Sequence, residues 1–207
     1  MVRLILIRHG ETDYSSESRY CGYSDPPLNK KGIWQVERLA ERLKRLNADK
    51  VYSSDSKRAA KTAKIIFKDK SIEESQDFRE INFGIFEGLK YEEIIKKYPK
   101  LYRTWLNNPT MVKIPEGEAL KDLSRRVRKR LSLILPQHKD GKIALVTHSG
   151  PIKVILCDTL KFSLEEFWQI EQDFGAFNII DYPLSLSPVV VEINDTSHFD
   201  TQEAVSS

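Results

Sequence analysis

Four side chains suited to phosphate chemistry follow short apolar segments of this chain. The run VRLILI is followed directly by Arg8 and His9. A later run, KIALVT, is followed by His148, and Arg58 comes shortly after the segment ADKVYSS. Guanidinium groups bind phosphate oxygens through paired hydrogen bonds, and a neutral imidazole can act as a nucleophile. If these four side chains meet, they form a site that binds a phosphoryl group.

The elements that would position them alternate between strand and helix. The apolar run at 2–7 is typical of a strand buried on both faces, and helical spacing runs from Asn29 to about Leu46. Other predicted elements are strands at 48–54, 142–148, 174–182 and 187–194, helices from Ser54 or Asp55 to about Phe67 and at 90–98, 99–107, about 120–135 and 149–160, and a loop at 76–89. This order favours an α/β fold with a mostly parallel sheet, in which ligands bind beyond the carboxyl ends of strands. His9 and His148 would then face one crevice.

The bulk composition is that of a globular chain. It has 207 residues, 40% of them hydrophobic, which is enough for one domain with a sizeable core. The net charge of +3 and the pI near 8.7 come from basic residues spread along the chain. This spread favours a small anionic ligand over nucleic acid. We expect a single domain over residues 1–195 and a flexible polar tail over residues 196–207.

The cysteines suggest the cellular compartment of the protein, and the histidines suggest whether it binds a metal ion. Cys21 and Cys157 are far apart and form no CxxC pair, which is typical of a reducing cytoplasm. The N-terminal residues lack the pattern of a secretory signal, and no apolar run approaches the ~20 residues that span a bilayer. We therefore expect a cytoplasmic protein with no membrane partner. The four histidines have no HxH or HExxH spacing, so neither a metal nor a cofactor is expected.

Five sequence blocks in order resemble the histidine phosphatase superfamily, the phosphoglycerate mutase-like group. They are LIRHGET, RYCGYSDPPLNKKG, VYSSDSKRAAKTA, REINFGIFEG and LVTHSG, and the similarity extends from residue 2 to about residue 160. The resemblance implies a three-layer α/β/α sandwich with a mostly parallel central sheet. It also implies a small phosphorylated metabolite as the partner, with a homodimer as the assembly to consider.

The resemblance also implies a role for each polar residue in these blocks. His9 would attack phosphorus and become a phosphohistidine, while Arg8, Arg58 and His148 neutralise the phosphate oxygens. Glu80 would protonate the departing alkoxide and then take a proton from the water that hydrolyses the phosphoenzyme.

Two further phosphate contacts are implied, the hydroxyl of Ser15 and the backbone N–H of Gly22. Relatives commonly have asparagine where this chain has Ser15, and serine reaches less far. Glu87 is the alternative candidate for the acid, and Cys21 lies near the site as a small residue or a reactive thiol. The remaining arginines of helix 120–135 and the other two histidines are predicted to be solvated: Arg125, Arg126, Arg128, Arg130, His138 and His198.

Later blocks narrow the substrate class. YPKLYRTWLNNPTMVKIPEGEAL, EEFWQIEQDFGAFNIIDY and INDTSHF are similar to alpha-ribazole phosphatases of cobamide (cobalamin) assembly. Such an enzyme needs a pocket of nucleoside size, and three aromatic residues could line it: Tyr102, Trp105 and Phe174. Alternatively, they are ordinary residues of the hydrophobic core. The same blocks occur in metal-independent phosphoserine phosphatases and in broad-specificity phosphomonoesterases. A phosphoglycerate mutase is less favoured because the chain lacks the extra segment those enzymes carry, and the intact site residues disfavour a non-catalytic partner subunit.

Overall fold

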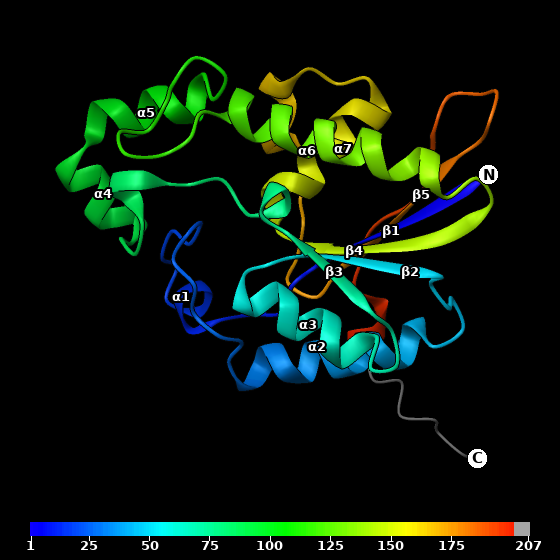
Figure 1. Cartoon of the computed structure of the whole chain (residues 1–207). Coiled ribbons are helices and arrows are strands. Elements are labelled where there is room, and N and C mark those ends of the chain that lie inside the picture. Colours follow the sequence, from blue (N-terminus) through cyan, green and yellow to red (C-terminus); the bar gives the residue numbers. More distant parts are fainter. Residues whose placement is uncertain (201–207) are drawn as a thin grey trace.

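The computed structural model describes residues 1–200 and has a six-stranded sheet between two layers of helices (Figure 1). The strands are β1 (Val2–Arg8), β2 (Lys50–Ser54), β3 (Ile72–Ser75), β4 (Gly141–Thr147), β5 (Phe177–Tyr182) and β6 (Val189–Asp195), in the spatial order β3-β2-β4-β1-β5-β6. β3, β2, β4 and β1 run parallel, whereas β5 is antiparallel to both β1 and β6. The predicted three-layer α/β class with a mostly parallel sheet is confirmed.

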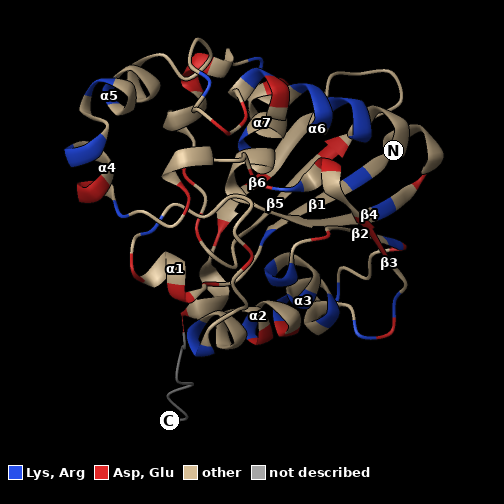
Figure 2. Cartoon of the chain, turned by 60° about the vertical axis from the view of Figure 1, so that its left-hand side comes forward, with Lys and Arg blue, Asp and Glu red and all other residues tan. Residues whose placement is uncertain are grey.

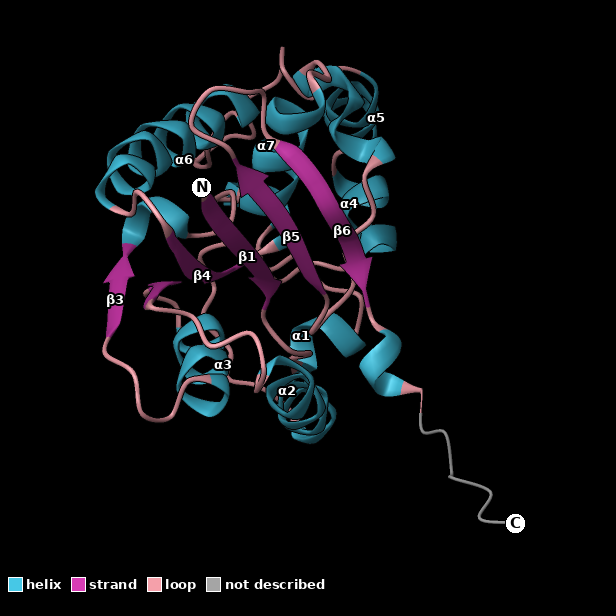
Figure 3. Ribbon diagram, turned by 90° about the vertical axis from the view of Figure 1, so that its right-hand side faces the viewer, coloured by secondary structure: helices cyan, strands magenta, loops and turns pink. Residues whose placement is uncertain are grey.

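The helices divide into the two layers and an outer group. They are α1 (Asp13–Ser16), α2 (Lys30–Leu43), α3 (Lys57–Ile66), α4 (Tyr91–Lys97), α5 (Pro99–Asn107), α6 (Leu120–Ile134) and α7 (Ser149–Leu160), with 3-10 turns η1 (Gln76–Phe78), η2 (Gly84–Phe86), η3 (Leu135–Gln137), η4 (Leu164–Gln169) and η5 (Ser197–Phe199). Figure 3 shows α2 and α3 on one face of the sheet and α6 and α7 on the other. In Figure 1, α4 and α5 lie on the side where β1 ends.

The two layers explain why β1 is apolar at successive positions. Leu4 and Leu6 face the cluster that contains α6 and α7, and Ile5 and Ile7 face the cluster that contains α2 and α3. Each of these side chains is at most 1% exposed, and burying one contributes about 1.5–3 kcal/mol. Strand β1 is therefore a firm scaffold for the residues that follow it.

The helix starts follow from capping chemistry. Asn29 caps α2 as predicted, because its side chain accepts a hydrogen bond from the Gly32 N–H. The predicted cap of α3 at Ser54 or Asp55 is wrong, since the N-cap residue is Ser56. The hydroxyl of Ser54 lies instead against the ring of His148.

The last described residues pack against the domain. His198 in η5 is buried, and the ring of Phe199 stacks on Trp34 with 5.5 Å between centroids. The expected tail thus contains a packed helical turn, and the predicted surface position of His198 is wrong. Residues 201–207 of that tail lie outside the described residues.

The outer surface has a mixed charge. Figure 2 shows basic and acidic positions interspersed along the helices of both layers. Within residues 1–200, no helix is both long enough and apolar enough to cross a lipid bilayer.

Candidate active site

A cavity of about 250 Å³ lies beyond the carboxyl end of β1. In the sheet, Arg8 pairs with Thr147 of the parallel neighbour β4. The next residues along the two strands, His9 and His148, are therefore brought together, and their ring centroids are 4.9 Å apart. The cavity is lined by Arg8, His9, Ser15, Ser18, Arg19, Tyr20, Cys21, Arg58, Glu80, Phe83, Ser149 and Phe174.

The His9 ring is held in one tautomer. Its Nδ1 lies 2.7 Å from the carbonyl oxygen of Gly10, which can only accept, so Nδ1 carries the proton. The other nitrogen, Nε2, accepts from Nε of Arg58 at 3.3 Å. Burial, together with the charges of Arg58 and Arg8, holds the pKa of His9 well below its usual value. The ring is therefore a neutral imidazole with its lone pair on Nε2.

Arg58 is fully buried in the first turn of α3 and connects His9 to a loop. Its Nη1 and Nη2 donate to the carbonyl oxygens of Ser24 and Gly22, both at 2.8 Å. Nε donates to His9, so three of the five N–H groups of the guanidinium have partners among residues 1–200. Arg58 also lines the cavity, and its Nη1 lies 3.8 Å from Oδ1 of Asp25.

Arg8, the last residue of β1, provides a second cation. Its guanidinium carbon lies 3.5 Å from the ring centroid of Phe174, and its Nη1 donates to the carbonyl oxygen of Gln172. Its Nε is buried and has no hydrogen-bond partner in residues 1–200. Burial lowers the pKa of Arg8 to about 10, so the group is still charged at neutral pH.

His148 is fully buried behind His9. Its Nε2 forms hydrogen bonds with the hydroxyls of Ser54 and Ser56 at 3.0 and 3.2 Å. Its Nδ1 is without a partner in the described part of the chain. Burial is the largest cause that lowers the pKa of His148 well below its usual value, and Arg58 is the next. The ring is therefore neutral and can offer one polar nitrogen to a neighbouring group.

The carboxylate of Glu80 is held by backbone N–H groups. Both of its oxygens lie 3.1 Å from the Gly150 nitrogen, and Oε1 also accepts from the Ile81 N–H at 2.9 Å. A Cβ atom on residue 150 would lie 2.0 Å from Oε1, so only glycine permits this approach. Glu80 is 8% exposed and lines the cavity that contains His9.

Arg126 fixes the main chain around Glu80. It donates to the carbonyl oxygens of Asp77, Arg79 and Glu80 at 2.7–2.9 Å and forms an ion pair with Glu118 at 2.8 Å. The predicted solvated face of this helix is therefore wrong at Arg126. Sequence reasoning missed this role because the partners are main-chain groups almost fifty residues away.

Glu87 organises the loop that Arg58 contacts. Its carboxylate accepts from the N–H groups of Gly22, Tyr23, Ser24 and Phe83 at 2.9–3.1 Å, and from the Ser24 hydroxyl at 2.6 Å. With five donors on two oxygens, Glu87 is a structural anchor for the loop. The N–H of Gly22, predicted to contact phosphate, donates to this carboxylate.

The other sequence candidates occupy different places. Ser15 lines the cavity, but its hydroxyl lies 2.9 Å from that of Thr12 in the cap of α1. Burial raises the pKa of the Cys21 thiol to about 11, which keeps it protonated and poorly nucleophilic. No group of three or more His, Cys, Asp or Glu side chains within residues 1–200 is arranged to hold a metal ion.

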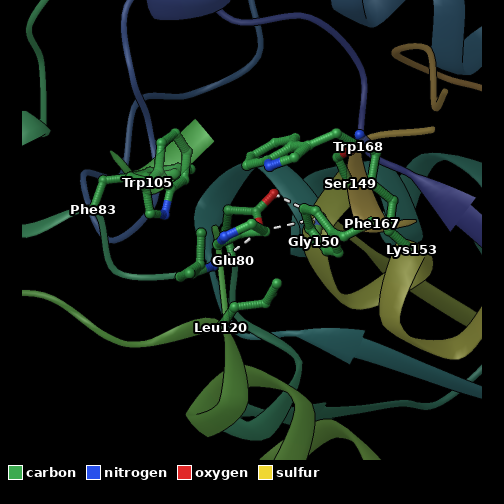
Figure 4. Close-up of a pocket in the computed structure, with 11 residues that line it drawn as sticks. Glu80, Phe83, Trp105, Leu120, Ser149, Gly150, Lys153, Phe167 and Trp168 are labelled. Carbon is green, nitrogen blue, oxygen red and sulfur yellow. Dashed lines mark hydrogen bonds between the residues drawn. The ribbon is translucent and has the colours of Figure 1, made fainter. Parts of the chain in front are cut away.

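A second pocket of about 70 Å³ adjoins the cavity and shares Glu80, Phe83 and Ser149 with it. Figure 4 shows the rings of Trp105 and Trp168 near Glu80, with 4.9 Å between their centroids. The complete lining is Glu80, Ile81, Phe83, Trp105, Pro109, Leu120, Ser149, Gly150, Lys153, Phe167 and Trp168.

The three aromatic residues predicted to wall a pocket or to serve as core lie in different places. Trp105 lines the second pocket, and Phe174 lines the cavity that contains His9. Tyr102 lines neither and packs in an apolar cluster with Trp105, with 6.0 Å between the ring centroids, and its hydroxyl lies 2.6 Å from that of Tyr20. The three rings do not share one wall, and Tyr102 is a core residue, which was the alternative prediction.

The fold and the cavity together define an α/β protein with a buried neutral imidazole set between two guanidinium groups. A model of the histidine phosphatase superfamily (branch 1) matches residues 4–196. Phosphoserine phosphatase 1 of Hydrogenobacter thermophilus is 33% identical over 200 residues, 96% of this chain and 94% of that protein. The chain belongs to the histidine phosphatase superfamily, as the five sequence blocks indicated.

Two solved structures show the same fold. Bacillus stearothermophilus YhfR superposes with a TM-score of 0.91 at 28% identity, covering 97% of this chain and all of that one. The alpha-ribazole phosphatase from Shigella flexneri superposes with a TM-score of 0.85 at 26% identity, covering 94% of this chain and 96% of that one.

Proposed function

We propose that this protein is a phosphomonoesterase that transfers the phosphoryl group of a small metabolite first to His9 and then to water. The observation that carries the proposal is the state of the His9 ring. Its Nδ1 proton is bound to the Gly10 carbonyl, its pKa is lowered, and its Nε2 lone pair lies beside Arg58. This is the form of imidazole that can attack phosphorus without first losing a proton.

In the first step, Nε2 of His9 forms a bond to phosphorus as the bond to the ester oxygen breaks. Arg58 and Arg8 stabilise the charge on the phosphoryl oxygens, and the Nδ1 of His148, which has no partner in residues 1–200, is available for a further contact. Glu80, in its protonated form, gives its proton to the departing alkoxide. The products are a phosphohistidine and a free alcohol.

In the second step, Glu80 takes a proton from a water molecule. That water forms a bond to phosphorus as the phosphorus–nitrogen bond breaks, which releases phosphate and restores His9. Because two guanidinium groups supply positive charge at the phosphoryl group, we propose that no metal ion takes part.

The phosphoenzyme gives the direct test. A substrate labelled in its phosphate is mixed with the enzyme, quenched within milliseconds and analysed for acid-labile phosphate on His9. We expect a labelled histidine in the wild type, and in His9→Ala neither label nor phosphate release above about 10⁻³ of the wild-type rate. The absence of label together with no hydrolysis of a broad monoester panel would favour a non-catalytic partner subunit.

Two substrates stand as candidates. Alpha-ribazole 5'-phosphate is favoured by the sequence blocks that resemble alpha-ribazole phosphatases, and the Shigella flexneri enzyme shares the fold. Phosphoserine is favoured by similarity to phosphoserine phosphatase 1 along 96% of the chain. The first has a large neutral leaving group and the second a small one with a carboxylate. The test measures kcat/KM for alpha-ribazole 5'-phosphate, phosphoserine, 3-phosphoglycerate and an aryl phosphate, and a clear preference decides between the two candidates. Isomerisation of phosphoglycerate that depends on 2,3-bisphosphoglycerate would instead indicate a mutase.

A further inference from the structure

The second pocket contains one cation, Lys153, on the fifth residue of α7. Within residues 1–200, no carboxylate lies within ion-pair distance of its ammonium group. Nζ lies instead 5.3 and 5.5 Å from the ring centroids of Phe167 and Trp168. Aromatic faces attract a cation but compensate for lost hydration less fully than an anion does. Glu80 also lines this pocket, but its carboxylate lies beyond ion-pair distance of Nζ, so an incoming anion could form a close ion pair with the ammonium.

Most residues that line the pocket are apolar, and Figure 4 shows Lys153 beside Phe167 and Trp168. Burial lowers the pKa of Lys153, which reflects its poor hydration. An ion pair formed there would be stronger than one on the surface, because fewer water molecules screen the two charges.

The position of the pocket fits a leaving group. It shares Glu80 with the cavity that contains His9, and Glu80 is the proposed donor of a proton to the ester oxygen. A leaving group whose ester oxygen lies at Glu80 can therefore extend into this pocket, toward Lys153. Lys153 is the one cation among the described residues that line this pocket.

The size of the pocket restricts that leaving group. A cavity that admits benzene measures about 150 Å³, whereas this pocket measures about 70 Å³. By itself this pocket accommodates a few non-hydrogen atoms, such as a carboxylate with one or two carbons.

We propose that Lys153 binds a carboxylate on the leaving group, so that the preferred substrates are phosphomonoesters of small hydroxy acids. This inference rests on the proposed phosphatase function and adds to it a specificity-determining residue. It favours the phosphoserine type of substrate over the nucleoside type.

The test uses two substrates that differ only by the carboxylate, O-phospho-L-serine and O-phosphoethanolamine. In the wild type we expect kcat/KM to favour phosphoserine by at least about 30-fold, mainly through KM, as for a partly buried charge pair. In Lys153→Met, which keeps an unbranched stem without the charge, we expect the ratio of the two values to fall to about one. The ratio is the readout, so a general loss of activity in the variant does not imitate the effect.

Two further variants complete the experiment. Lys153→Glu should invert the ratio because the new carboxylate repels that of phosphoserine. Lys129→Met, which removes an exposed lysine of α6, should keep the wild-type ratio. A wild-type ratio near one, or a Lys153→Met ratio equal to that of the wild type, overturns the carboxylate site. Phosphohistidine formation from 4-nitrophenyl phosphate is measured in the same preparations. If the wild-type enzyme forms no phosphohistidine, the proposed phosphatase function is overturned rather than the carboxylate site.

Discussion

The cavity around His9 and the pocket around Lys153 adjoin but are built differently. In the cavity, most polar groups have protein partners: His9 bonds to Gly10 and Arg58, and Glu80 bonds to backbone N–H groups. In the pocket, aromatic rings surround an ammonium without an ion-pair partner in residues 1–200. The cavity depends on the register of β1 and β4, together with Arg58 of α3 and the loop that contains Glu80. The pocket is lined by residues of that loop and of α5, α6, η4 and α7. The sheet register thus brings the two histidines together, and we expect the segments around the pocket to influence which substrate fits.

Glu80 lines both the cavity and the pocket. Among the variants that test the difference between these two regions, we expect replacement of Glu80 to lower the rate most. For Glu80→Gln, we expect kcat to fall by about 10²–10⁴ with phosphoserine, because the alkoxide leaves without a proton donor. The first step with 4-nitrophenyl phosphate should slow far less, since nitrophenolate leaves without protonation. Burst kinetics that separate the two steps provide the measurement. An equal loss in the first step for both substrates would contradict the assignment of Glu80 as the acid.

Glu87 lines neither the cavity nor the pocket and supports the loop that Arg58 contacts, so we expect its loss to leave the choice of substrate unchanged. In Glu87→Gln, an amide with one acceptor oxygen replaces a carboxylate with two. Some of the five donors then lose their partner, and the loop that Arg58 contacts is held less firmly. We expect about 1–3 kcal/mol less stability in urea unfolding and a similar fractional loss of kcat/KM for phosphoserine and phosphoethanolamine.

The control for this variant is Glu92→Gln, which changes an exposed residue of α4. It should leave both stability and activity near wild type. If Glu87→Gln changes the ratio of kcat/KM for phosphoserine to that for phosphoethanolamine, the cavity and the pocket do not act separately.

From the buried imidazoles of His9 and His148 we predict a smaller effect: the free energy of unfolding should depend on pH. The pKa values of His9 and His148 are lowered in the folded protein, so below about pH 6.5 the unfolded chain binds protons that the folded chain does not. Stability should therefore fall as pH drops from 7.5 to 5.5, by up to about 1.4 kcal/mol per pH unit for each titrating histidine. In His9→Ala the slope should be shallower. Equal slopes in denaturant titrations of the two proteins would show that His9 is not held neutral by burial.

Much of the cavity could be predicted from the sequence because its chemical residues directly follow apolar strands. The run before Arg8, apolar apart from Arg3, predicts a strand buried on both faces, and the strand-end positions bring His9 and His148 together. Strand β3 was missed because its sequence, IEES, has one apolar residue and lies at the edge of the sheet. Sequence patterns identify residues by local neighbours, and this edge strand depends on pairing with β2.

The supporting contacts were harder to predict, since their partners are distant backbone groups. Arg126 looked like one more cation on a polar helix face, and Glu87 like a second candidate acid. Both act through main-chain atoms dozens of residues away. Lys153 lies in an apolar helix, where the sequence gives no sign that its ammonium faces two aromatic rings.

The close approach of Gly150 to Glu80 provides a way to classify related sequences. Any larger residue at that position would push the carboxylate from its place, even in a chain that retains every histidine, arginine and glutamate of the cavity. Homologues that lack this glycine should therefore be set apart as candidates for lost or altered turnover before any are assayed. The residue at position 150 is thus a property to compare between homologues alongside the polar residues of the cavity.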